Sequence, residues 1–207
     1  CAGVNAWKSK MTAITFTARK IDNAARGSSQ CAVLPLYHRK KLSTAAQQLD
    51  VASGGAISAA MALGDFSGKA GESCILPGAG GAKRLLLVGC GDPGTFDRAA
   101  AREFGRTLIK AISTTRASDA VLHSADLHPK DGSTPWLMQT LARQLTCASY
   151  RYTETLSKPK PPMKLSRLVV NVGDSRSVKS GQKALDHGAA LGNGINEARR
   201  LADLPGN

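Results

Sequence analysis

Short apolar runs alternate with stretches of helical periodicity along most of this chain of 207 residues. Alternating apolar and polar positions predict a first strand over residues 12–17, and compact apolar runs predict further strands. These are expected at residues 31–36, 73–76, 84–90, 120–122 and 165–172. The glycine-rich segment 77–81 predicts a hairpin turn, and Pro35 indicates either an edge strand or the end of a strand.

Apolar residues three or four positions apart predict helices between these strands. We expect them over residues 43–51, 56–63, 97–113, 136–145 and 177–201. Ser43 is a suitable N-cap for the first of them. Because strands and helices alternate, the sequence predicts an α/β fold, a three-layer sandwich with a mixed central sheet.

Two segments fit neither pattern. Residues 1–10 are interpreted as a disordered leader or tag, and the proline-rich run 157–162 as a solvated basic loop. We therefore expect an α/β domain over 11–174, followed by a long helix and linker over 175–207. The apolar runs are too short to span a bilayer and no secretion signal is recognisable, so we expect a cytoplasmic protein without membrane contact.

Charge changes this picture, because the net charge of +13 is concentrated in two regions. Residues 1–41 hold eight Lys or Arg against one Asp, and residues 143–183 hold nine against two acidic residues. Such clustering predicts a polyanionic partner or an acidic neighbouring domain.

A basic stripe recurs every fourth residue from Arg98 to Lys110, opposite the apolar Phe104, Leu108 and Ile112. It is either the solvated side of an amphipathic helix or a face that tracks the phosphates of DNA. A sequence-nonspecific DNA-binding module would use the basic residues of this stripe and of the two clusters. These are Arg39, Lys40, Lys41, Arg98, Arg102, Arg106, Lys110, Lys158, Lys160 and Lys164.

The segment 89–94 has the spacing G-x-G-x-x-G between a predicted strand and a predicted helix. A dinucleotide site would use its backbone amides to hold a pyrophosphate. Pro93 has no N–H, however, and Asp97 would repel phosphate, so a plain strand-to-helix turn is favoured. Gly89 and Gly91 remain the basis of a weaker alternative, a binder of nucleotide or ADP-ribose.

No residue pattern indicates a catalytic centre. The four histidines do not pair at the spacing of metal ligands, and the five cysteines lack zinc-type spacing. A nucleophile elbow and a carboxylate cluster for a two-metal hydrolase are also absent from the sequence. We therefore assign no catalytic residue, no metal ligand and no cofactor to this chain.

Several segments, taken in order, resemble the N-terminal part of leucyl (cytosol) aminopeptidases. The motifs are a helix, a "G-D-F-x-G-K" turn, a strand and glycine turn, a "Y-r-y" segment and a closing helix with a "Leu-Pro-Gly-Asn" exit. They lie at residues 42–50, 63–69, 84–92, 148–153 and 188–207. Together they extend the resemblance over residues 11–207.

The resemblance implies a macro-domain-like fold packed against a C-terminal peptidase domain that this chain lacks. That domain would use two divalent metals, zinc or manganese, to remove N-terminal residues such as leucine from peptides. It also implies a cytoplasmic homo-hexamer and, for some bacterial members, DNA binding. The family's metal-binding motif "N-T-D-A-E-G-R" matches nothing here. The expected contacts with the peptidase domain are Gly188, Gly192 and Ile195, in a helix rich in small residues.

Overall fold

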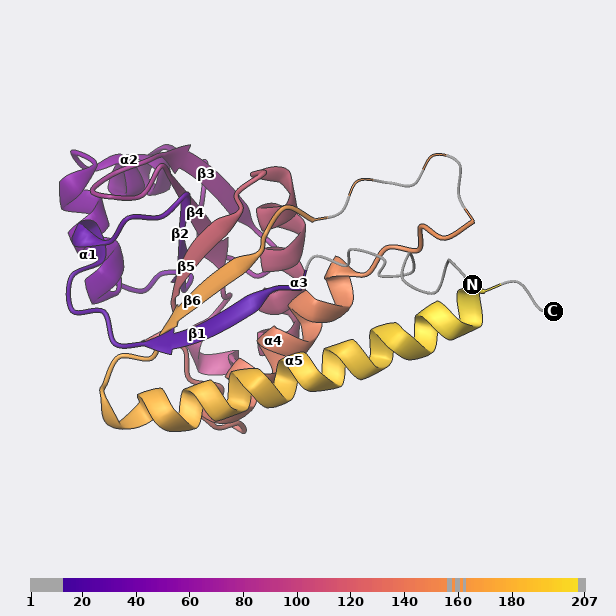
Figure 1. The fold of residues 1–207 in the computed structure, drawn as a ribbon. Helices are drawn as coiled ribbons and strands as arrows, with labels where there is room; N and C mark the ends of the chain where they lie inside the picture. The colour runs from indigo at the N-terminus through magenta and orange to yellow at the C-terminus, as the bar shows by residue number, and fades with distance from the viewer. Residues whose placement is uncertain (1–12, 156–157, 159–160, 162, 205–207) are drawn as a thin grey trace.

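The structure, a computed structural model, describes residues 13–155, 158, 161 and 163–204. Its centre is a six-stranded sheet in the order β1-β6-β5-β2-β4-β3 (Figure 1). Neighbouring strands are parallel except for β3, which pairs antiparallel with β4. This confirms the mixed sheet and the hairpin between the third and fourth strands. The strands are β1 (Thr15–Arg19), β2 (Cys31–Leu36), β3 (Ser73–Pro77), β4 (Arg84–Gly89), β5 (Asp119–His123) and β6 (Arg167–Asn171).

Helices cover both faces of the sheet, as the three-layer prediction requires. One face packs against α1 (Thr44–Ala52) and α2 (Ala56–Leu63). The other packs against α3 (Arg98–Thr114), α4 (Thr134–Ser149) and α5 (Arg176–Asp203). Adjacent residues of β2 point to opposite faces, so Val33 belongs to the α3–α5 core and Leu34 to the α1–α2 core.

The start of the first strand differs from the prediction, and of the two interpretations of Pro35 only the strand end holds. The first strand begins at Thr15, where its ladder with Arg167 of β6 begins, rather than at residue 12, which lies outside the described residues. The strand that contains Pro35 is central in the sheet, so the edge interpretation fails. Pairing of β2 with β5 stops at Val33, and Pro35 therefore lies near a strand end, where a missing donor is tolerated.

The long helix α5 runs along α4 and extends past the sheet (Figure 1). A Cβ atom on Gly188 would lie 2.2 Å from the carbonyl oxygen of Gln139, so this contact with α4 requires glycine. Further along, Asn196 Nδ2 donates to the carbonyl oxygen of Thr146 over 2.8 Å. Residues 175–204 are thus tied to the preceding domain, while the division of the chain at residue 174 stays a prediction.

Two polar contacts hold the distal end of α5. The hydroxyl of Tyr150 donates to Asp203 over 2.6 Å, and Arg200 pairs with the largely buried Glu154 at 3.2 Å. In the part of the chain that the structure describes, no helix combines the length and the apolar character that a membrane span needs.

Candidate functional site

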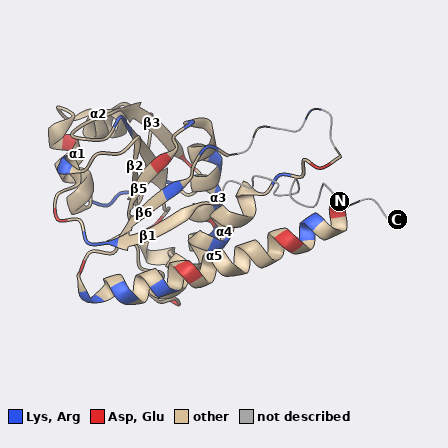
Figure 2. Cartoon of the chain, viewed as in Figure 1, with Lys and Arg blue, Asp and Glu red and all other residues tan. Residues whose placement is uncertain are grey.

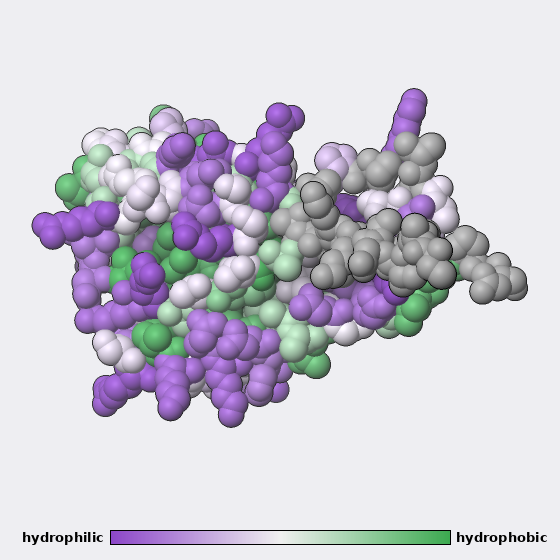
Figure 3. Space-filling view, in the orientation of Figure 1, coloured by the Kyte–Doolittle hydropathy of each residue, from purple (hydrophilic) through white to green (hydrophobic). Residues whose placement is uncertain are grey.

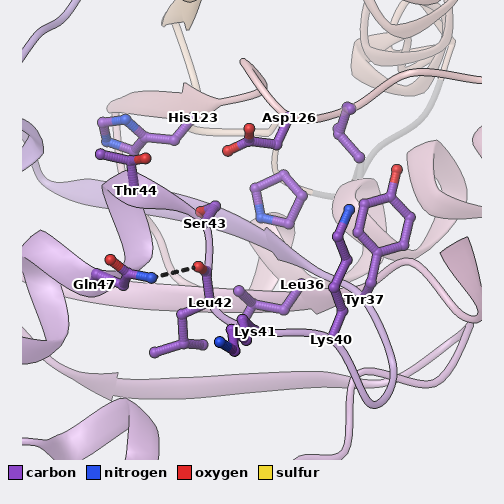
Figure 4. Close-up of a pocket in the computed structure, with 12 residues that line it drawn as sticks. Leu36, Tyr37, Lys40, Lys41, Leu42, Ser43, Thr44, Gln47, His123 and Asp126 are labelled. Atoms are coloured by element: carbon purple, nitrogen blue, oxygen red, sulfur yellow. Dashed lines mark hydrogen bonds between the residues drawn. The ribbon is translucent and has the colours of Figure 1, made fainter.

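A crevice opens where two neighbouring parallel strands, β2 and β5, end. The chain leaves β2 toward α1 on one face of the sheet, and it leaves β5 toward α4 on the other face. Such a divergence is where open α/β sheets place their ligands. A cavity of about 230 Å³ lies here, which we call the crevice. Its polar lining includes Lys40, Lys41, Ser43, Thr44, His123 and Asp126 (Figure 4).

The start of α1 forms one wall of the crevice. Ser43 caps the helix, because its hydroxyl accepts a hydrogen bond from the amide of Ala46 over 3.3 Å. Lys40 and Lys41 precede it in the loop, and the Lys40 Nζ atom lies 4.9 Å from the centre of the Tyr37 ring. This wall therefore combines two cations with the positive end of a helix.

His123 forms the opposite wall, at the last residue of β5. The residue is 5% exposed, and its Nδ1 atom has no hydrogen-bond partner among the described residues. Burial lowers the pKa of this imidazole from 6.5 to about 4. The ring is therefore neutral at physiological pH, with an unpaired polar atom in the interior.

The glycine turn after β4 closes on the protein itself. The amides of Gly89, Cys90 and Gly91 donate to the carbonyl oxygens of Glu72, Leu36 and Gly68, each over 2.9 Å. The structure thus confirms a strand-to-helix turn. None of these three amides is free to hold a phosphate, so Gly89 and Gly91 give no support to nucleotide binding.

The start of α3 is also occupied by the protein's own carboxylates. Asp97 caps the helix by accepting from the amide of Ala100, and Asp131 accepts from the amide of Arg98 over 2.7 Å. Two carboxylates at the N-terminus of α3 would repel an anionic ligand there. The sequence already indicated this repulsion for Asp97.

The predicted basic stripe lies on α3, with its apolar side buried as expected. Its first two members stack on α4, because the guanidinium carbons of Arg98 and Arg102 lie 5.1 and 5.8 Å from the centre of the Trp136 ring. Arg106 is bound by Glu103 within the same helix, and Lys110 lies exposed further along. The stripe is therefore partly used by contacts within the fold.

The structure adds two arginines that the sequence analysis missed. Arg143 of α4 and Arg199 of α5 line one groove with Arg102 and Arg106, which we call the arginine groove. Its volume is about 440 Å³. Arg102 and Arg106 belong to the predicted stripe on α3, whereas Arg143 and Arg199 come from other helices and join them only because α3, α4 and α5 pack together, so no local pattern could reveal these two.

The other predicted DNA contacts do not join this groove. Arg39, Lys40 and Lys41 follow β2 at the carboxyl edge of the sheet, whereas Lys164 precedes β6 at the amino edge. Lys158 and Lys164 are exposed, and Lys160 lies outside the described residues. Basic residues gather instead in the first turns of α5, as Figure 2 shows.

The outer side of α5 carries a shallow apolar groove. It is lined by Gln139, His187, Ala190, Leu191, Gly194, Ile195 and Ala198, and we call it the α5 groove. Leu191 is 50% exposed. Green side chains appear along the distal part of the helix in Figure 3, beyond a hydrophilic first half. Ile195 borders both this groove and the arginine groove.

The predicted interface residues lie on different sides of α5. Gly188 and Gly192 are buried against α4, where a Cβ atom on Gly192 would lie 2.6 Å from Thr146 Cβ. Ile195 belongs to the exposed α5 groove. The assignment of all three residues as contacts with a further domain stays a prediction.

Metal ligation finds no support in the described residues, which contain no group of three or more His, Cys, Asp or Glu side chains able to hold an ion. These side chains therefore do not fit the two divalent metals that the resemblance to leucyl aminopeptidases implies. His38 instead contacts the carbonyl oxygen of Ser67, with its Nδ1 atom 2.8 Å away. Four cysteines, Cys31, Cys74, Cys90 and Cys147, are free thiols.

Comparisons with known proteins give consistent matches. The model of the "Cytosol aminopeptidase family, N-terminal domain" matches residues 33–159. A probable cytosol aminopeptidase of Alkalilimnicola ehrlichii is 36% identical over 183 residues, which is 87% of this chain and 37% of that protein. One from Burkholderia orbicola is 33% identical over 87% of this chain and 36% of its own length.

Solved structures show the same fold. A mutant of tomato leucine aminopeptidase superposes with a TM-score of 0.70 at 20% identity, covering 93% of this chain and 38% of that one. The bottromycin maturation enzyme BotP in complex with Mn gives 0.58 at 18% identity, covering 86% and 32%. This chain thus spans little more than a third of the length of its curated relatives.

Proposed function

The chain belongs to the cytosol aminopeptidase family through the N-terminal domain of that family, and on this premise we propose that it is the non-catalytic domain of a metalloaminopeptidase. The observation that carries the proposal is the family match over residues 33–159, joined to a described chain with no metal-binding group. Its role would be assembly or regulation of the peptidase part.

The peptidase part would hold the chemistry. In our proposal a C-terminal domain with two divalent metals, zinc or manganese, removes N-terminal residues such as leucine from peptides. The relatives' names support peptide cleavage in the cytosol, and their unmatched two thirds leave room for that domain. A homo-hexamer is the assembly we propose for the complete enzyme.

The α5 groove is the surface that we propose for the peptidase domain. Leu191 and Ile195 lie in an apolar groove on the outer side of the helix, and the inner side is already filled by α4. An exposed apolar groove of this kind is typical of a protein contact. The match covers 37% of the length of the Alkalilimnicola ehrlichii relative, and we propose that the remaining part of such a protein covers the α5 groove.

A chimera tests this proposal. The N-terminal domain of the Alkalilimnicola ehrlichii relative would be replaced by this chain, and hydrolysis of leucine-p-nitroanilide would be measured with added manganese. We expect the chimera to cleave and to sediment as one large assembly, and the chain alone to be inactive. Cleavage by the chain alone, with contaminating peptidases excluded, would contradict the division of roles.

A pair of variants locates the contact. Leu191→Asp and Ile195→Asp introduce charge into the α5 groove and should reduce the activity of the chimera by about tenfold or more and dissociate its assembly into smaller species. Val51→Asp is the matched control, because Val51 is 82% exposed and lies on α1, away from α5. An equal loss in the control would show that the groove is not the contact.

The arginine groove supports a second candidate, sequence-nonspecific DNA binding. Four guanidinium groups from three helices line one surface, and Trp136 lies beside them under Arg98 and Arg102. Basic residues clustered on one surface are the electrostatic feature expected of a nucleic-acid-binding protein. The observation favours this groove over the loop clusters at Arg39 and Lys158.

Salt dependence tests this candidate. Four phosphate contacts predict that the affinity for duplex DNA falls about a hundredfold between roughly 50 and 200 mM salt. Replacing Arg102 and Arg143 by alanine should reduce the slope of log K against log salt by about two. The double variant at Lys158 and Lys164 is the comparison, and a larger loss there would move the contact away from the groove.

A further inference from the structure

We propose that the crevice between β2 and β5 binds a small oxyanion, the carboxylate or phosphate group of a metabolite. The oxyanion would lie in the cavity at the N-terminus of α1, which Lys41, Thr44 and His123 line (Figure 4). This site is separate from the α5 groove and from the arginine groove, so it does not rest on either function proposed above.

The helix wall supplies donors. Ser43 satisfies the amide of Ala46, but the amides of Thr44 and Ala45 donate to no other described residue. The first turn of α1 contains no acidic side chain that would cancel the positive end of the helix. Free amides at a helix N-terminus that borders a cavity are suited to an oxyanion.

Charge in the crevice favours the same chemistry. Lys40 and Lys41 both line it, whereas Asp126 is the one carboxylate among the described residues of its lining. Asp126 is exposed, so it remains hydrated at the rim. A ligand that also carries an ammonium group, such as an amino acid, would find a counter-charge there.

The buried imidazole is an independent indication of a ligand. His123 is 95% removed from solvent and lines a cavity, yet none of the described residues offers its Nδ1 atom a hydrogen bond. Leaving a buried polar atom unsatisfied costs free energy, and a bound group at the crevice would offer the ring a partner. A neutral ring can donate from one nitrogen to an oxyanion and accept at the other.

The dimensions limit the size of the ligand. A cavity of about 230 Å³ lies below the range of roughly 300–1,000 Å³ found for sites that take drug-sized molecules. The crevice is therefore suited to a free amino acid or a small phosphate ester, while most of a dinucleotide would remain outside it.

The test is a titration of the 207-residue chain with inorganic phosphate and, separately, with leucine, each up to about 10 mM against chloride of equal ionic strength. The ring signals of His123 would be followed by NMR, with the exposed His187 on α5 as the internal reference. We expect saturable shifts at His123 and none at His187. A response to phosphate alone identifies a phosphoryl group, and a response to leucine alone identifies a carboxylate with an ammonium group at Asp126.

Two variants separate a specific site from general attraction. Lys41→Ala should weaken binding at least about tenfold, because it removes a charge-assisted contact. Lys110→Ala, on the exposed side of α3, removes the same charge elsewhere and should leave binding unchanged. The proposal is overturned if neither ligand shifts His123, if His187 shifts equally, or if both variants lose the same affinity.

Discussion

The crevice and the contact between α4 and α5 both contain buried polar atoms that have no partner in the described part of the chain, but the space beside those side chains differs. His123 Nδ1 belongs to a side chain that borders an open cavity. Thr146 Oγ1 and Asn196 Oδ1 lie instead in a helix contact that glycines have closed. The same kind of atom therefore indicates a ligand in one place and only a packing cost in the other.

The two regions also differ in whether another group could relieve the free-energy cost of the unsatisfied polar atom. At the crevice, His123 lines an open cavity, and the lysines and helix amides of the opposite wall favour an anion. Between α4 and α5, a Cβ atom on Gly192 would already lie within 3 Å of Thr146, so a further group has no room. An unsatisfied polar atom points to binding when a cavity adjoins it.

The largest expected effect tests the burial of His123. Its pKa is about 4 in the folded chain and near 6.5 when unfolded. Above pH 6.5 neither state binds the proton, so the full stability is present. As the pH falls from 6.5 to 4, the unfolded chain gains a proton that the fold excludes, and the free energy of unfolding should fall by about 3 kcal/mol. Urea unfolding at several pH values measures this loss.

The variant His123→Gln isolates that contribution from the carboxylates, which also titrate in acid. Glutamine keeps a polar side chain but cannot be protonated, so the variant should lose less stability between pH 6.5 and 4 than the parent chain does. Identical pH slopes in the two proteins would mean that the imidazole is solvated in the folded chain and that burial does not lower its pKa.

A second prediction compares two glycines of α5. In Gly188→Ala the new methyl group would collide with the carbonyl oxygen of Gln139 at 2.2 Å, and overpacking of this kind costs about 2 kcal/mol. Gly194 has no atom within 4 Å of its Cβ position, so Gly194→Ala should stabilise the chain by about 0.8 kcal/mol through helix propensity.

Both variants carry the same chemical change in the same helix. The difference between their thermal unfolding temperatures therefore measures the difference in packing at the two positions. Opposite signs are expected. If Gly188→Ala were as mild as Gly194→Ala, the contact between α4 and α5 would have to be loose. The polar atoms between these helices would then be open to water like those of the crevice.

The fold could be predicted from the sequence to a large extent, because most of its strands and helices carry strong local patterns. The apolar runs at β2, β4 and β6 and the helical period of α3 identify these elements without tertiary information. The position of Pro35 in the sheet could not be predicted, since strand order depends on crossovers rather than on local composition.

Neither candidate surface could be assembled from sequence in the same way. The crevice joins Lys41 to His123, and the arginine groove joins Arg102 to Arg199, across elements that only the tertiary fold brings together. The small residues of α5 were expected to pack closely against another domain, whereas the structure shows Gly188 and Gly192 packed against α4 of the same chain. A glycine pattern indicates close approach and does not identify which element approaches.

The smallest expected effect tests the closed contact between α4 and α5. Thr146 is buried in α4, and its Oγ1 atom has no partner among the described residues. Thr146→Val replaces this hydroxyl by a methyl group of similar shape and keeps the β-branch, so helix propensity hardly changes. Relief of the unsatisfied hydroxyl should raise the free energy of unfolding by about 0.5 kcal/mol, as urea denaturation would measure.

A loss of about 1 kcal/mol or more would mean that a buried water bonds the hydroxyl, because valine cannot replace that bond. The contact between α4 and α5 would then resemble the crevice, and an adjoining cavity would no longer distinguish a binding site from a packing cost.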